Sequence, residues 1–76
     1  KQVRFDDLVR VLEGIGWVET GVHGSHHRYE APADPDDWTI VVRPHGGRKH
    51  CRPADVEKIL AIVERVSGDE DDTGDQ

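Results

Sequence analysis

All five histidines of this 76-residue chain fall in two short stretches, residues 23–27 and 45–50. Histidine gives up and takes a proton near neutral pH, so it can serve as a general acid or base under cellular conditions. RNA supplies its own nucleophile, the 2′-hydroxyl next to each phosphodiester. A positioned histidine, with nearby cations that stabilise the charge developing on the phosphoryl oxygens, is therefore enough to cleave RNA without a metal ion.

A basic segment contains the other two histidines, His45 and His50. Residues 43–52 hold four basic side chains and no acidic one; they are Arg43, Arg48, Lys49 and Arg52. Such a segment contacts phosphates in nucleic-acid binders, although it fits an acidic protein partner equally well. The whole chain has a net charge of −6, but five of its sixteen acidic residues lie in residues 69–76. Residues 1–68 are nearly neutral, with ten basic and eleven acidic side chains.

Five of these side chains also have the chemistry of zinc ligands: His23, His26, His45, His50 and Cys51. Structural zinc sites usually show tightly paired ligands, and only His23 and His26 come close to that spacing. A zinc site is therefore disfavoured, and we expect neither a metal nor a small-molecule cofactor.

Cys51 is the only cysteine, so the chain cannot form an internal disulfide. Small secreted domains usually carry several disulfides, which makes a reducing environment the natural interpretation. No apolar run approaches the length of a membrane span. We therefore expect a cytoplasmic protein with no membrane partner.

Two helices must help to position these side chains. Apolar residues at helical spacing predict a first helix over about residues 4–13. Pro53 and the apolar stripe that follows it predict a second helix, which we expect to stop at Gly68. The acidic composition of residues 69–76 predicts a disordered tail, so the domain itself comprises residues 1–68.

Three short strands are predicted between the helices, over residues 17–20, 25–31 and 38–43. Gly21 and Gly24 bracket the first turn. Alternation along the second strand puts His26, Arg28 and Glu30 on one face and Ser25, His27 and Tyr29 on the other. His26 and His27 therefore point in opposite directions, and we assign no chemistry to His27.

The two tryptophans are candidates for stacking on nucleobases or for packing in the core. In the third strand Trp38 shares a face with Ile40 and Val42, so we expect Trp38 to lie in the core. The surroundings of Trp17 leave both interpretations open.

The order of elements is helix, three strands, helix. It predicts an α+β domain with a three-stranded antiparallel sheet and both helices on one sheet face. The other face of the sheet, and the loops at its edge, are then left for a ligand.

Four motifs resemble the HicA family of messenger-RNA interferases. They are Gly16-Trp17-Val18, Gly24-Ser25-His26-His27-Arg28-Tyr29, Pro44-His45-Gly46-Gly47-Arg48 and Arg52-Pro53 at the start of the second helix. The resemblance covers roughly residues 5–66. It implies a fold like that of double-stranded-RNA-binding domains, metal-independent cleavage of messenger RNA, and inhibition by a HicB antitoxin.

The resemblance also implies that the family's essential histidine falls on His26, with Gly24 and Ser25 shaping the turn that aims it. From their positions we expect a further set of residues to contact RNA; these are Ser25, Arg28, His45, Arg48, Lys49 and Arg52. The acidic charge balance favours an alternative, in which the same fold is a non-catalytic module that binds RNA or protein.

Overall fold

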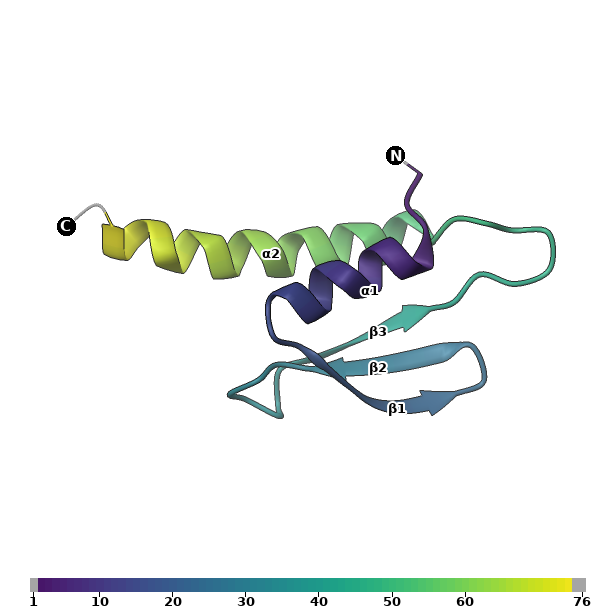
Figure 1. Cartoon of the computed structure of the whole chain (residues 1–76), viewed down its shortest axis with the longest axis horizontal. Helices are drawn as coiled ribbons and strands as arrows, with labels where there is room; N and C mark the ends of the chain where they lie inside the picture. Colours follow the sequence, from purple (N-terminus) through teal and green to yellow (C-terminus); the bar gives the residue numbers. More distant parts are fainter. Residues whose placement is uncertain (1, 75–76) are drawn as a thin grey trace.

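The computed structural model describes residues 2–74, and their side chains as far as Ser67. Its elements are α1 (Phe5–Gly14), β1 (Val18–His23), β2 (His26–Glu30), β3 (Trp38–Val42) and α2 (Pro53–Gly74). The strands form one antiparallel sheet in the order β1–β2–β3, and both helices lie on the same side of it (Figure 1). The predicted α+β class and the order of elements are confirmed.

The core lies between the helices and the sheet face beneath them. Its buried apolar side chains are Phe5, Leu8, Leu12, Trp17, Tyr29, Val41, Cys51, Val56, Ile59 and Ile62. The chain leaves α1 through Gly16, whose φ of +91° is a conformation that side chains other than glycine rarely adopt. A Cβ atom at Gly16 would also lie 3.2 Å from Cγ of Pro32, a close contact that adds to the preference for glycine set by the positive φ.

The predicted core position of Trp38 is wrong. Trp38 is 49% exposed on the sheet face away from the helices, whereas Trp17 is 3% exposed and lies in the core. The predicted alternation along β3 is correct, but the buried face is the one that carries Thr39 and Val41. The register explains this, because Thr39 lies opposite Tyr29, which is 2% exposed beneath the helices.

The first hairpin is longer than predicted. β1 continues to His23, so Gly21 belongs to the strand and the turn consists of Gly24 and Ser25 alone. Gly24 adopts a φ of +62°, as the tight turns that join twisted strands require. A β-bulge lies between Glu19 and Gly21, where one extra residue in β1 re-aims the side chains before it.

The second helix is also longer than predicted, since α2 runs past Gly68 to Gly74. A glycine inside a helix costs about 1 kcal/mol relative to alanine, which does not by itself end the helix. The division into a domain of residues 1–68 and a tail of residues 69–76 stays a prediction. Residues 75–76 lie outside the part of the chain that the structure describes.

The start of α2 covers the outer edge of β3. The carboxylate of Asp55 accepts a hydrogen bond from the Val42 amide at 3.2 Å, and Nζ of Lys58 donates one to the Ile40 carbonyl at 3.0 Å. These side chains satisfy backbone groups that an edge strand would otherwise leave unpaired. They also fix where α2 begins relative to the sheet.

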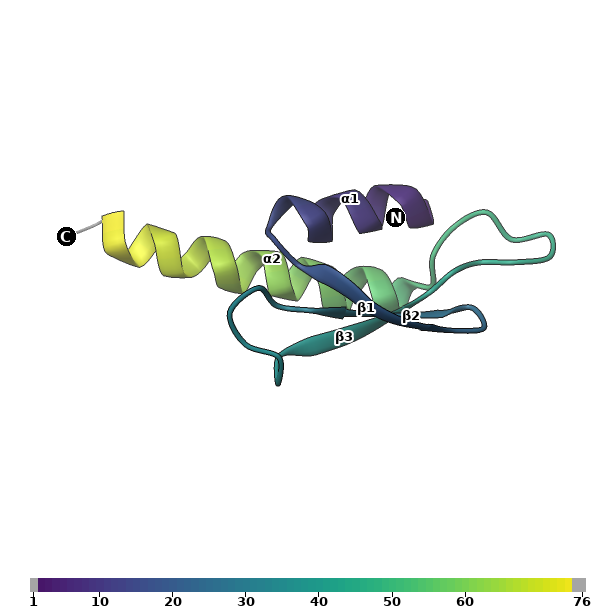
Figure 2. The ribbon, with the colours of Figure 1, turned by 60° about the horizontal axis from the view of Figure 1, so that its bottom comes forward.

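A long loop, residues 43–52, joins β3 to α2, and we call it the basic loop. Figure 2 shows it projecting at the end of the molecule opposite the C-terminus. Within residues 2–74, no helix has both the length and the apolar character needed to cross a membrane.

Candidate functional site

The sheet face that the helices leave uncovered, which we call the helix-free face, carries three cross-strand rows of residues. The register gives them as Val18–Glu30–Trp38, Gly21–Arg28–Ile40 and His23–His26–Val42. The third row lies next to the turn between β1 and β2 and next to the start of the basic loop. The predicted alternation of His26 and His27 between the two faces of β2 is confirmed.

His26 is the exposed first residue of β2, directly after the turn. Its cross-strand neighbours are His23 on β1 and Val42 on β3. The carbonyl of Ser25 accepts a hydrogen bond from the Arg43 amide at 2.8 Å, which ties the turn to the first residue of the basic loop. The local backbone around His26 is therefore held on both sides.

A pocket of about 450 Å³ lies between the end of β3 and the start of α2. The predicted RNA-binding residues His45, Arg48 and Arg52 all line it, together with His50. Val42, which is paired with His26 across β2 and β3, lines it as well; His26 itself is not among the lining residues. We call this cavity the histidine-side pocket.

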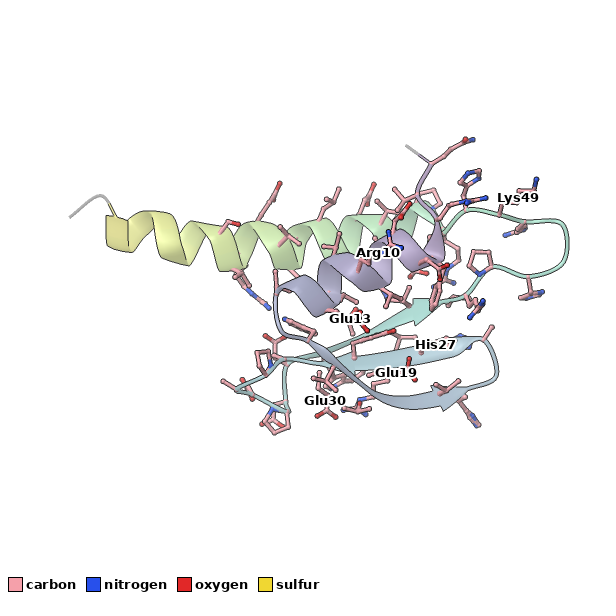
Figure 3. All side chains as sticks on the ribbon, in the orientation of Figure 1. Arg10, Glu13, Glu19, His27, Glu30 and Lys49 are labelled. Carbon is pink, nitrogen blue, oxygen red and sulfur yellow. The ribbon has the colours of Figure 1, made fainter. Side chains whose placement is uncertain are left out.

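A second pocket, of about 300 Å³, lies on the other side of the basic loop against the start of α1. Lys49 lines this pocket and not the first, while Arg48 lines both; in Figure 3, Lys49 projects from the loop. Arg4 and Arg43 add two further cations, and the guanidinium of Arg43 lies 5.3 Å from the centre of the Phe5 ring. Sequence reasoning missed Arg4, because only the folded chain brings the start of α1 to this loop.

A buried carboxylate holds Arg52 at the edge of the histidine-side pocket. Asp55, with a side chain that is 0% exposed, accepts hydrogen bonds from Nε and Nη2 of Arg52 at 3.1 and 3.0 Å. Burial alone would raise the pKa of Asp55, but the hydrogen bonds from Arg52 and the Val42 amide and the charges of Arg52 and Lys58 lower it. Asp55 therefore stays ionised and offsets much of the charge of Arg52.

Arg48 differs from Arg52 in this respect, because it forms no ion pair with any of the described side chains.

Arg28 does not join the other predicted RNA-binding residues. Its guanidinium lies 4.5 Å from the centre of the Trp38 ring, and its Nη2 lies 3.4 Å from Oε2 of Glu30. Figure 3 shows Glu30 at the end of β2 far from Lys49. Arg28 shares the helix-free face with His26, as predicted, but its side chain is drawn toward Trp38 and away from the basic loop.

His27 lies on the opposite face and packs under α1. Its ring centre is 4.9 Å from that of Phe5, and its Nδ1 is 3.3 Å from Oε1 of Glu19 (Figure 3). The same Glu19 oxygen accepts a hydrogen bond from the Tyr29 hydroxyl at 3.2 Å. Burial, followed by the charge and hydrogen bond of Glu19, raises the pKa of Tyr29 to about 12. The contacts of His27 are those of a packing residue.

The described side chains contain no group of three or more His, Cys, Asp or Glu residues arranged to hold a metal ion. Cys51 is buried, and its amide donates a hydrogen bond to the Val3 carbonyl at 2.7 Å. His23 and His26 sit on the sheet, whereas His45 and His50 belong to the basic loop.

Comparison with known proteins identifies a family. A family model described as the HicA toxin of bacterial toxin-antitoxin systems matches residues 5–64, from α1 through the sheet and the basic loop into α2. No curated protein and no solved structure matches the chain. Because the family match covers most of the chain, this protein belongs to the HicA toxin family of bacterial toxin–antitoxin systems.

Proposed function

We propose that this HicA-family protein is a metal-independent endoribonuclease that cleaves messenger RNA, with His26 as a general acid or base. As a base, the imidazole would take the proton of a 2′-hydroxyl, and the 2′-oxygen would attack the adjacent phosphorus. The bond from phosphorus to the 5′-oxygen would break, leaving a 2′,3′-cyclic phosphate and a 5′-hydroxyl end.

The observation that carries the proposal is the position of His26. It is exposed, it follows a turn held by Ser25 and Gly24, and it is paired with Val42, which lines a pocket that also holds cationic side chains. A nuclease of this kind needs the histidine and the phosphate-binding groups to reach one phosphodiester at the same time. The pairing of His26 with Val42, which lines the histidine-side pocket, supports such an arrangement.

The basic loop would hold the phosphate. Arg48, which has no ion-pair partner among the described side chains, would stabilise the charge that develops on the phosphoryl oxygens, with His45 and Arg52 beside it. Lys49 would bind a neighbouring phosphate from the second pocket, and Arg28 would contact the strand where it crosses the helix-free face.

The family is that of a toxin controlled by an antitoxin, and we propose that the partner of this chain is a HicB-like protein. An acidic segment of the antitoxin would bind the cations of the basic loop of this chain. Binding there would cover the histidine-side pocket and block the substrate.

The second candidate function is a module that binds RNA or protein without cleaving it. The net charge of −6 favours this alternative, since an acidic chain repels nucleic acid at long range and so binds an RNA substrate less strongly. The two functions differ in one observable, which is whether the covalent backbone of bound RNA is broken.

Cleavage of a mixed-sequence RNA by the purified protein in excess chelator tests the proposal. The His26→Ala variant is compared with Val22→Ala, an exposed residue of the same hairpin whose side chain lies on the other sheet face. We expect wild type and Val22→Ala to cleave, and His26→Ala to be slower by about 10²- to 10⁴-fold. A wild-type protein that binds this RNA without cleaving it would instead establish the non-catalytic module.

A further inference from the structure

A second histidine lies beside His26 on the helix-free face. His23, the last residue of β1, is paired directly with His26 across the antiparallel ladder, and both residues are exposed. Directly opposed residues point to the same side of a sheet, with Cβ atoms about 4.5–5.5 Å apart. Both imidazoles can therefore reach one phosphodiester.

The two-residue turn of Gly24 and Ser25 creates this pairing, because the residues that flank such a hairpin turn lie directly opposite each other. Before the bulge Glu19 lies opposite Tyr29, and after it Gly21 lies opposite Arg28. The bulge affects the part of β1 before it: Glu19 is paired with buried Tyr29 on the helix side, whereas Gly21 and His23 lie on the helix-free face. The tight turn thus puts His23 on the same face as His26.

Few other groups on this face can exchange protons near neutral pH. The ionisable side chains of its three rows are His23, His26, Arg28 and Glu30. Arg28 and Glu30 form an ion pair with each other, with Nη2 and Oε2 3.4 Å apart, and Glu30 is four residues along β2 from His26, about 13 Å. From the basic loop, His45, Arg48 and Arg52 line the pocket that Val42, the neighbour of His26, also lines.

We propose that His23 and His26 form a paired phosphodiester site in which His23 is the second proton-transfer residue. The inference rests on the proposed ribonuclease function. Cleavage by the 2′-hydroxyl needs two proton transfers, one from the 2′-oxygen to a base and one from an acid to the departing 5′-oxygen. One histidine of the pair enters neutral and the other protonated, and they leave with these states exchanged. Two proton exchanges with water restore the starting state.

The rate of RNA cleavage in chelator as a function of pH tests this role, with Val22→Ala as the control because it is the neighbour of His23 on the opposite face. We expect a bell-shaped profile for wild type and Val22→Ala. His23→Ala should be slower by about 10²- to 10⁴-fold and should lose one limb of the bell, which a residue of purely structural importance would not remove. If His23→Ala cleaves as fast as Val22→Ala and keeps both limbs, the proposal is wrong.

A readout that needs no turnover separates this inference from the proposed function. Uridine 3′-monophosphate is titrated into the wild-type protein while the imidazole signals are followed by NMR, with assignments from His23→Ala and His26→Ala. We expect the signals of His23 and His26 to shift together. A shift of His26 alone would overturn the pairing. If both shift but wild type cleaves no RNA, the ribonuclease function fails while the paired phosphate site stands.

Discussion

The carboxylate of Asp55 should be among the largest single contributors to the stability of this domain. It is fully buried, and it joins the start of α2 to the edge of β3 through Arg52 and the Val42 amide. We predict that Asp55→Ala lowers the free energy of unfolding substantially, and that the loss comes from the contacts of this one side chain.

The size of the effect follows from what the substitution removes. Hydrogen bonds that involve a charged group contribute about 1.5–3 kcal/mol each, and the Val42 N–H left without a partner costs about 1–3 kcal/mol. Against this, the variant no longer buries a carboxylate, which costs several kcal/mol in the wild-type protein. We therefore expect a net loss of about 2–4 kcal/mol, out of a total of about 4–11 kcal/mol for a chain of this length.

Urea unfolding followed by the fluorescence of buried Trp17 measures this loss, and Asp37→Ala is the matched control. Asp37 forms an ion pair with Arg65 at 2.8 Å, but both side chains are at least one-third exposed, so its removal should cost at most about 1 kcal/mol. If Asp55→Ala is no more destabilising than Asp37→Ala, the reasoning from burial is refuted.

The stability difference between wild type and Asp55→Ala should also depend on pH. The folded protein lowers the pKa of Asp55, so its stabilisation is present above the unfolded-state pKa and is lost as pH falls through the folded-state value. The stability difference between wild type and Asp55→Ala should therefore shrink on acidification. A difference that stays constant down to acid unfolding would contradict this assignment.

The remaining predictions concern three other positions. Tyr29 is the only tyrosine, and its pKa is raised to about 12. Its stabilising contribution is therefore full below pH 10 and is lost as pH rises toward 12. Absorbance titration should show that Tyr29 ionises together with alkaline unfolding; ionisation near pH 10 in the folded protein would contradict this prediction. Trp38→Ala should weaken single-stranded RNA binding about 5- to 150-fold in the His26→Ala background, as judged by fluorescence anisotropy on protein that thermal melting shows to be folded; unchanged affinity would exclude stacking. Gly16→Ala should destabilise by at least about 1–2 kcal/mol because of its positive φ and the contact with Pro32; a melting temperature equal to that of wild type would argue against that strain.

Local patterns in the sequence were enough to predict the order of elements and the faces of β2. Alternation separates His26 from His27 whatever the rest of the fold does, because it depends only on strand geometry. The residues of β3 alone do not predict which of its faces is buried. Trp38, Ile40 and Val42 are more apolar than Thr39 and Val41, yet Thr39 and Val41 are the buried ones. The register partners of Trp38, Ile40 and Val42 on β2 include the charged residues Glu30 and Arg28, so considering both strands together would have indicated solvent for their face.

Other features have no local signal. The two-residue turn of Gly24 and Ser25 decides that His23 lies opposite His26, but Gly21 suits a turn as well as Gly24 does, so the residues alone do not show where the turn begins. The contribution of Arg4 to the second pocket depends on tertiary packing of α1 against the basic loop. Arg52 and Asp55 are only three residues apart in the sequence, but their ion pair owes its strength to the burial of Asp55 against β3, which the local sequence does not show.

In the proposed reaction RNA is cut by its own 2′-hydroxyl, with a histidine taking the hydroxyl proton. An oligodeoxynucleotide that contains a short run of ribonucleotides, incubated with the protein in chelator and analysed by mass spectrometry, tests this most directly. We predict cleavage confined to the 3′ side of ribonucleotides, with 2′,3′-cyclic phosphate and 5′-hydroxyl ends. Cleavage between deoxynucleotides, or products with 3′-hydroxyl and 5′-phosphate ends, would contradict the claim.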